Sequence, residues 1–278
     1  MPDFNRKSLV TLAVSSGKGG VGKSNVSVNL AAALGNAGHR VLLMDADLGL
    51  ANIDLLLGCR AEMTLEHVVR GEATLDEIVL NGPKGVKFIP AASGIEEMAN
   101  LGSVSQSNLI HDFGNLGLDP DFFIVDVAAG IHSSVVNFCL ATQHVIVVVC
   151  DEPTSLADAY GLIKVLSTKG VRKFTMLSSM VKNEQAGYAL YQKMLRATDR
   201  FLSVGVSYLG MVPFDENLRR AVRRQASVVH AYPQSQSARY FRQAADKIAR
   251  LSSPEGASGR LEFFMERLLK PNSFVEAV

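Results

Sequence analysis

The stretch Ser15-Ser16-Gly17-Lys18-Gly19-Gly20-Val21-Gly22-Lys23-Ser24-Asn25 decides the fold of this chain. It follows an apolar, strand-like run at 9–14 and opens a helix-like run at 26–34. Residues 17–24 fit the pattern G-x-x-x-x-G-K-[ST], in which backbone N–H groups surround phosphate oxygens. Because strand, glycine loop, Lys-Ser and helix follow in the required order, we interpret the stretch as a phosphate-binding loop and not as a simple tight turn.

The residues of this loop have separate expected roles. Lys23 is expected to reach the β- and γ-phosphates of a nucleotide, and the Ser24 hydroxyl to ligate Mg²⁺. The helix that starts here adds the positive end of its dipole. The residues expected to hold the nucleotide phosphates are Gly17, Lys18, Gly19, Gly20, Val21, Gly22, Lys23, Ser24 and Asn25.

Length and composition limit the other interpretations. A chain of 278 residues can bury the core of one large α/β domain or of two small ones. A net charge of +1 gives the protein no overall electrostatic attraction to nucleic acid or anionic lipid. The three cysteines, Cys59, Cys139 and Cys150, form no C-x-x-C pair, which argues against a disulfide framework and a zinc or iron–sulfur site. We recognise no signal peptide and no membrane-spanning run, so we expect a cytoplasmic protein.

Apolar β-type runs alternate with helical runs along the chain, which predicts right-handed βαβ units in a doubly wound, mostly parallel α/β sheet. Continuous apolar runs such as 145–149 are typical of strands buried on both faces. Strands are expected at 9–15, 41–45, 86–90, 122–126, 144–150, 173–179 and 207–212. Helices are expected near 24–37, 64–70, 105–114, 133–142, 155–168, 184–201, 215–224 and 235–251. We divide the chain into a nucleotide-binding domain at 1–251, a linker at 252–259, and a C-terminal amphipathic helix and tail at 260–278.

Two strand ends place carboxylates near the phosphate loop. The run Phe122-Phe123-Ile124-Val125-Asp126 is apolar and then acidic, as expected of a strand that holds the Mg²⁺ shell. The strand at 41–45 ends in Asp45-Ala46-Asp47, and carboxylates at i and i+2 leave a strand tip on the same side. One can therefore lie near the metal and its waters, and the other near an attacking water. The expected metal site consists of Ser24, Asp45 and Asp126.

The general loop pattern does not require a second lysine, yet Lys18 is present. Gly-Lys-Gly-Gly-Val-Gly-Lys-Ser resembles the deviant Walker A motif of the MinD/ParA superfamily of ATPases. The resemblance covers the chain from Leu9 to the C-terminus and keeps the order of the motifs. It implies an ATPase that dimerises face to face around two ATP and Mg²⁺, with Lys18 reaching the nucleotide of the other subunit.

The resemblance also implies individual residue roles. Asp47 would orient or activate the hydrolytic water, while Asp45 would support Mg²⁺ through water. The catalytic residues would then be Asp47, Lys18 and Lys23, in a slow reaction that depends on dimerisation. In this family adenine is read by an asparagine and by a proline-led segment; Pro213 and Asp215 match the second, while Ser179 stands at the position of the first.

The stretch at 48–58 resembles both MinD and its flagellar relative, called FlhG or FleN, and three further stretches, 89–94, 150–155 and 261–268, resemble the flagellar branch. This branch implies control of flagellar number or placement by antagonism of a FleQ/FlrC-like transcription activator, with the FlhF GTPase as a further partner at the cell pole. The alternatives are a ParA-type partition ATPase acting on DNA and a MinD-type division-positioning ATPase acting at the membrane. Iron–sulfur carrier ATPases and small-molecule kinases fit the sequence less well.

Two further regions have open interpretations. Arg219, Arg220, Arg223 and Arg224 form two adjacent i, i+4 pairs, expected on one side of a helix. They would contact DNA phosphates or an acidic partner, or else form a solvated face paired with Asp215 and Glu216.

The second region is at the C-terminus, where one apolar helical stripe is formed by Leu261, Phe264, Met265, Leu268 and Leu269. It resembles the membrane-targeting helix of MinD, and we expect it to contact the inner membrane surface when ATP is bound. The alternative is a helix packed permanently on the body of the protein or on the dimer partner.

Overall fold

The computed structural model describes residues 9–47, 51–91, 103–251 and 262–264. Its centre is an eight-stranded sheet with strand order β3-β4-β2-β5-β1-β6-β7-β8. The strands are β1 (Val10–Ser16), β2 (Val41–Ala46), β3 (Leu80–Asn81), β4 (Val86–Ile89), β5 (Phe122–Ala129), β6 (His144–Cys150), β7 (Lys173–Val181) and β8 (Gly205–Pro213). Neighbouring strands pair in parallel, except that the short β3 is antiparallel to β4. The expected doubly wound, mostly parallel sheet is confirmed.

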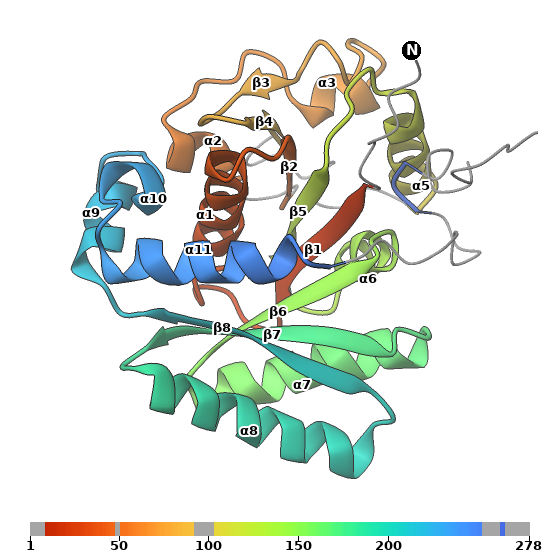
Figure 1. Ribbon diagram of the computed structural model, residues 1–278. Helices are drawn as coiled ribbons and strands as arrows, with labels where there is room; N and C mark the ends of the chain where they lie inside the picture. The colour runs from red at the N-terminus through yellow and green to blue at the C-terminus, as the bar shows by residue number, and fades with distance from the viewer. Residues whose placement is uncertain (1–8, 48–50, 92–102, 252–261, 265–278) are drawn as a thin grey trace, which may run out of the picture.

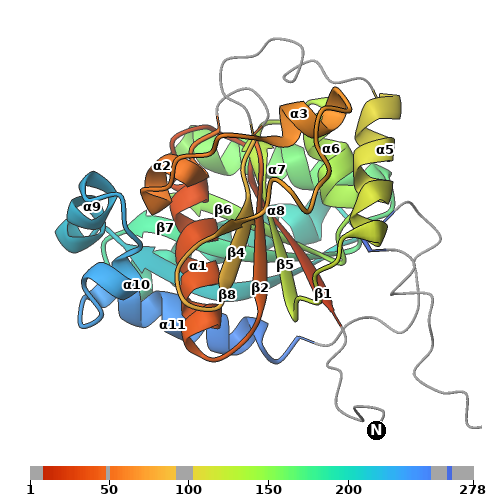
Figure 2. The ribbon, with the colours of Figure 1, turned by 90° about the horizontal axis from the view of Figure 1, so that it is seen from above.

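Helices cover both faces of this sheet (Figures 1 and 2). One face packs against α1 (Lys23–Asn36), α10 (Val228–Ala231) and α11 (Gln236–Ile248). The other face packs against α5 (Ser103–Asp112), the short 3₁₀ turn η1 (Phe113–Asn115), α6 (Ser133–Leu140), α7 (Pro153–Thr168) and α8 (Glu184–Phe201). Three shorter helices are α2 (Ile53–Leu57), α3 (Leu65–Val69) and α9 (Glu216–Arg223). No helix in the described parts of the chain has the length and apolar character needed to cross a bilayer.

The central strand β1 shows why the strands are apolar on both sides. Val10, Leu12 and Val14 belong to the core layer beneath α1 and α11, whereas Ala13 belongs to the layer beneath α5 to α8. Successive residues of a strand point to opposite faces, so a strand between two helical layers is buried at every position and mostly apolar. Because β1 and β2 both pair in parallel with β5, the carboxyl ends of these three strands lie side by side at one end of the sheet.

Three short elements were not expected from the sequence. The strand β3 has two residues, and the helices α2 and α10 have five and four. Elements of this length contain too few residues to show a period of 2 or 3.6. All seven expected strands and all eight expected helices have counterparts in the structure, with ends shifted by a few residues.

The expected C-terminal helix lies mostly outside the described residues, which here comprise only Glu262, Phe263 and Phe264. These three residues form a turn: Phe263 N–H donates to the Ala141 carbonyl at 3.0 Å, and Phe264 has a φ of +57°. A residue in the left-handed conformation interrupts an α-helix. The expectation of a helix that runs through Phe264 was therefore wrong at this position. Both rings are fully buried and meet Phe113 and Phe123 at centroid distances between 5.0 and 5.8 Å. Phe263 and Phe264 are thus core residues.

Candidate nucleotide site

The phosphate loop joins β1 to α1, which begins at Lys23. Gly20 and Gly22 have φ values of +81° and +87°, which glycine adopts without the penalty that a side chain would impose. A Cβ on Gly17 would lie 2.1 Å from the carbonyl carbon of Asp158, so only glycine lets α7 approach the loop this closely. The N-cap of α1 is Gly22, which has no side chain to cap the first N–H groups of the helix. Those N–H groups can bind an anion.

Behind the loop, Lys23 and Asp126 form a buried ion pair. Lys23 Nζ lies 3.0 Å from Asp126 Oδ1, and the Ser27 hydroxyl donates to the same oxygen at 2.7 Å. Asp126 Oδ2 is buried and has no hydrogen-bond partner within the described residues. An unsatisfied buried carboxylate oxygen is costly, and a hydrated Mg²⁺ would supply the missing partner. The residues present therefore fit the expected metal, with Ser24 next to Lys23 as a second oxygen ligand.

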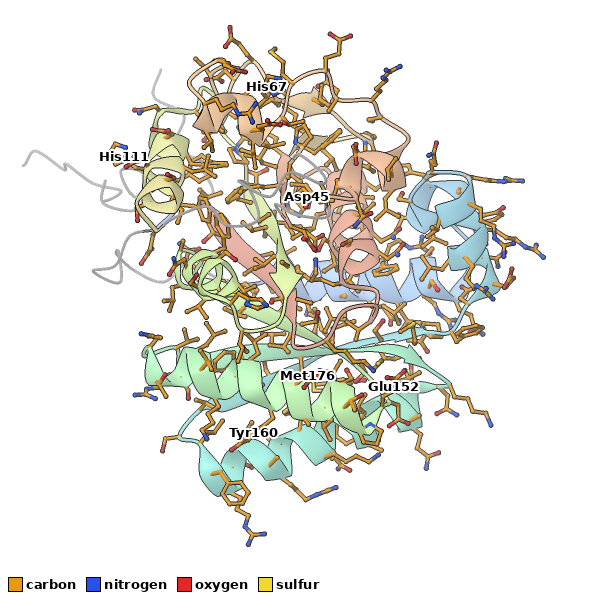
Figure 3. The ribbon with its side chains drawn as sticks, turned by 180° about the vertical axis from the view of Figure 1, so that it is seen from behind. Asp45, His67, His111, Glu152, Tyr160 and Met176 are labelled. Carbon is orange, nitrogen blue, oxygen red and sulfur yellow. The ribbon has the colours of Figure 1, made fainter. Side chains whose placement is uncertain are left out.

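Asp45 lies directly opposite Asp126 where β2 pairs with β5. Its carboxylate accepts the main-chain N–H groups of Asp47 at 3.0 Å, Asn52 at 2.9 Å and Ile53 at 3.1 Å. Complete burial and the nearby Asp126 charge raise the pKa of Asp45 to about 7, although the three amides lower it. Figure 3 shows Asp45 among the strands at the centre of the molecule. Two adjacent buried carboxylates at this end of the sheet would attract a cation.

Asp47 is half-buried immediately after β2, with its N–H held by Asp45. The structure thus brings Asp47 to the same end of the sheet as Asp45 and Asp126. Residues 48–50, which follow it, lie outside the described residues. The role of Asp47 toward the attacking water stays a prediction.

Lys18 lies on the outer side of the loop, away from the buried pair. Its Nζ donates to Glu152 Oε2 at 2.5 Å and to Thr154 Oγ1 at 3.0 Å, at the start of α7. The hydrogen bond to Glu152 raises the pKa of Lys18. Figure 3 labels Glu152 at this end of α7. The contact between Glu152 and Lys18 was not predicted from the sequence; the available signal was an acidic residue directly before a helix-starting proline.

A cavity of about 340 Å³ continues from the phosphate loop to the ends of β7 and β8. Its lining includes Gly22 and Asn25 from the loop and α1, Ser179 from β7, and Pro213 from β8. Its size and mostly apolar walls suit a small organic ligand. Because it adjoins the phosphate loop, it is the place where a nucleoside would lie.

Asp215 lines this cavity, but its carboxylate already has partners. Oδ1 accepts the N–H of Asn217 at 2.8 Å, which caps α9, and Oδ2 accepts the N–H of Ser237 at 2.9 Å, next to the start of α11. Asp215 therefore fixes the position of the cavity wall. Pro213 and Ser179 both line this cavity, and Ser179, which stands at the expected asparagine position, is almost completely buried.

Arg219, Arg220 and Arg223 lie in α9 and Arg224 is its C-cap, and their spacing places all four within an arc of about 140° around the helix axis. Arg219 and Arg223 line the cavity, whereas Arg224 lies over the Tyr232 ring at 5.4 Å. The two i, i+4 pairs differ by one residue, which turns them about 100° apart around the helix. Arg219 also pairs with Glu216 at 3.4 Å, as the solvated-face interpretation expected.

A family model described as ParA, NUBPL iron-transfer P-loop NTPase, matches residues 8–249. The chain belongs to the ParA/MinD family of P-loop NTPases. Within the ParA/MinD family it is 47% identical over 260 residues to the protein named Antiactivator FleN of Pseudomonas aeruginosa, covering 93% of each chain. It is 32% identical over 274 residues to the Flagellum site-determining protein YlxH of Helicobacter pylori, covering 96% of this chain and 92% of that one.

Among solved structures, MinD from Pyrococcus horikoshii in complex with Mg-ADP has a TM-score of 0.74 and 26% identity, covering 87% of this chain and 96% of that chain. ParA/MinD proteins are P-loop ATPases, and this complex shows that the family binds nucleotide with Mg²⁺.

Of the three cysteines, Cys139 and Cys150 are buried and Cys59 is half-buried. Within the described residues no group of three or more His, Cys, Asp or Glu side chains is arranged to hold a metal.

Proposed function

We propose that this chain is an ATP-hydrolysing dimerisation switch that regulates flagellar number or placement. The observation that carries the proposal is the partly exposed Lys18 beside a complete phosphate loop. The names of the two relatives, an antiactivator and a flagellum site-determining protein, support the flagellar role. The output of the switch would be a change in oligomeric state.

The proposed chemistry assigns one task to each group of the site. Main-chain N–H groups of the loop and Lys23 bind the phosphates, and Ser24 and Asp126 hold Mg²⁺, with Asp45 supporting it. Mg²⁺ supplies charge neutralisation for phosphoryl transfer. Asp47 orients the attacking water, and Lys18 of the second subunit adds positive charge at the phosphates. The phosphates would give Lys23 new partners, so that Asp126 keeps the Ser27 hydroxyl on Oδ1 and offers Oδ2 to the metal or its waters.

We further propose that the ATP-bound dimer binds a FleQ/FlrC-like transcription activator and blocks it, with the FlhF GTPase as a second partner. The test is capture of the purified activator by the immobilised protein, with ATP and with ADP. ATP should promote capture, and Lys18→Ala should abolish this effect. Cells carrying Lys18→Ala should have an abnormal number of flagella. Equal capture in both nucleotides would contradict the proposal.

A second candidate is a MinD-type positioning ATPase that acts at the membrane, favoured by the structural similarity to MinD. It would use the C-terminal segment at 260–278, tethered by the proposed linker at 252–259 to the domain at 1–251, and it would require Phe263 and Phe264 to leave the core in which they are buried. Vesicle flotation with ATP and with ADP tests this function. Flotation only with ATP would support it, and flotation in neither state would remove it.

The ParA-type alternative is binding to duplex DNA. The affinity for duplex DNA should then decrease steeply as the salt concentration rises.

A further inference from the structure

Ser27 lies one turn after Ser24 on α1 and is completely buried. Its hydroxyl oxygen lies 2.7 Å from Asp126 Oδ1 on β5 and 3.3 Å from the main-chain carbonyl oxygen of Lys23. A hydroxyl has one proton to donate, and a carboxylate is the stronger acceptor, so Ser27 donates to Asp126. The phosphate-loop pattern ends at Ser24 and does not include this residue.

The two carboxylate oxygens of Asp126 have different surroundings. Oδ1 accepts the Ser27 hydroxyl and lies 3.0 Å from the Lys23 ammonium, whereas the buried Oδ2 has no hydrogen-bond partner within the described residues. Nucleotide phosphates would attract Lys23, and Ser27 would remain as the donor to Oδ1. The Ser27 hydroxyl therefore keeps Oδ1 occupied and leaves Oδ2 to a cation or one of its waters.

The neighbouring carboxylate is held in a similar way. Asp45 Oδ1 accepts the N–H of Asp47, and Oδ2 accepts the N–H groups of Asn52 and Ile53. Main-chain amides cannot be removed by exchanging a side chain, but the Ser27 hydroxyl can. Ser27 is thus the group through which the number of free carboxylate oxygens at this site can be changed.

The number of free oxygens affects which cation is preferred. Ca²⁺ accepts many oxygen ligands in a flexible geometry and often binds both oxygens of one carboxylate, whereas Mg²⁺ requires a near-octahedral shell and keeps several waters. A carboxylate with one oxygen held by a hydroxyl is poorly suited to bind a cation through both. We infer that Ser27 is a positioning residue that restricts Asp126 to one free oxygen and thereby favours Mg²⁺ over Ca²⁺. This inference rests on the proposed binding of nucleotide with Mg²⁺ at Asp126.

The test compares the two cations in one variant, Ser27→Ala. The Kd for ADP, which is not hydrolysed, is measured by calorimetry in EDTA, in Mg²⁺ and in Ca²⁺, and the effect of a cation is the Kd in EDTA divided by the Kd with that cation. Ser27→Ala should lower the Mg²⁺ effect about tenfold, as expected when a group that orients a metal ligand is lost. It should lower the Ca²⁺ effect by less than about threefold, because the freed Oδ1 offers Ca²⁺ a second oxygen. The Kd in EDTA should stay within about twofold of the wild type, because the loop N–H groups are unchanged.

Ser167→Ala is the matched control. Ser167 is also a buried helical serine, and its hydroxyl donates to the Lys164 carbonyl at 2.7 Å. It lies at the end of α7 that is far from the phosphate loop. Neither cation effect should change in Ser167→Ala, and urea unfolding of both variants shows that each is folded.

An unchanged Mg²⁺ effect in Ser27→Ala would overturn the inference and leave the proposed function intact. So would equal losses with Mg²⁺ and Ca²⁺, since Ser27 would then not distinguish the two cations. A matching loss of ADP binding in EDTA would mean that the variant disturbs the phosphate loop, which also overturns the inference. A wild type whose ADP binding does not respond to Mg²⁺ would overturn the proposed metal site itself, and the inference with it.

Discussion

Lys18 and Glu152 form an ion pair of 2.5 Å within one chain, between the phosphate loop and the start of α7. The partly exposed Lys18 ammonium therefore already has a carboxylate partner before any second subunit arrives. A dimer in which Lys18 reaches the other nucleotide has to exchange this contact for phosphate oxygens. The lysine that distinguishes this loop from a general phosphate loop is thus held at the surface, away from the buried Lys23.

Lys18→Ala should retain ATP binding and lose the hydrolysis that depends on dimerisation. The loop N–H groups and Lys23 remain, whereas the charge offered to the partner's phosphates is removed. Turnover per subunit, measured over a range of protein concentrations, should rise with concentration in the wild type and stay flat in the variant. Lys169→Ala, at the opposite end of α7, is the control. A variant with wild-type turnover at every concentration would contradict the assignment.

Asp126→Asn should reduce the effect of Mg²⁺ on nucleotide binding. The amide keeps the shape of the side chain but removes the charge that holds the cation, along with the unsatisfied carboxylate oxygen. The ratio of the Kd values for ATP without and with Mg²⁺ should fall toward unity. Asp246→Asn, at an exposed position of α11, should keep the wild-type ratio. A wild-type ratio in Asp126→Asn would mean that Mg²⁺ is held elsewhere.

Phe263→Ala should lower the free energy of unfolding by about 3–5 kcal/mol, because it leaves a cavity among packed aromatic rings. The ring is fully buried and lies 5.0 Å from both Phe113 and Phe123 between centroids. Urea unfolding followed by circular dichroism measures the change. Phe201→Ala, at an exposed position, should stay within about 0.5 kcal/mol of the wild type. If the two variants were equally stable, the turn at 262–264 would not belong to the core.

His230 should make the protein less stable in mild acid. Burial lowers the pKa of His230, whose ring nitrogens lie 2.8 Å from Ser227 Oγ and 3.0 Å from Asn36 Oδ1. Between the two pKa values the unfolded chain binds the proton more readily, so this stability is complete above the unfolded pKa of about 6.5 and decreases as pH falls through the native pKa. The free energy of unfolding should therefore decrease from about pH 7.5 to about pH 5.5.

His230→Gln should make this decrease smaller, and His111→Gln on the exposed side of α5 is the control. Denaturation curves at the two pH values give the comparison. An unchanged pH dependence in His230→Gln would show that other groups cause the loss.

The strands, the main helices and the carboxylates of the site could be predicted because each depends on local pattern. Strands buried on both faces have long apolar runs, and Asp45 in β2 and Asp126 in β5 come directly after such runs. Contacts between distant parts of the chain leave no such pattern. The short helix α10 starts where the Val228 N–H donates to Asn29 Oδ1 at 2.8 Å, across 199 positions of sequence.

The direction in which side chains point could not be predicted from the sequence either. The spacing of the α9 arginines gave their pairs but not which pair borders the cavity, since that depends on how α9 packs. At the C-terminus the apolar spacing favoured a continuous helix, yet Phe264 adopts a left-handed conformation in a turn among buried aromatic rings. In both places tertiary packing decided the outcome.

The most direct test of the ATP-dependent dimer is the mass of the protein in solution with ADP and with ATP. The wild type should be a monomer with ADP and a dimer with ATP. Asp47→Ala should stay dimeric in ATP because hydrolysis is blocked, and Lys18→Ala should stay monomeric. A monomer in every case would contradict the switch and leave a conventional P-loop enzyme as the better account.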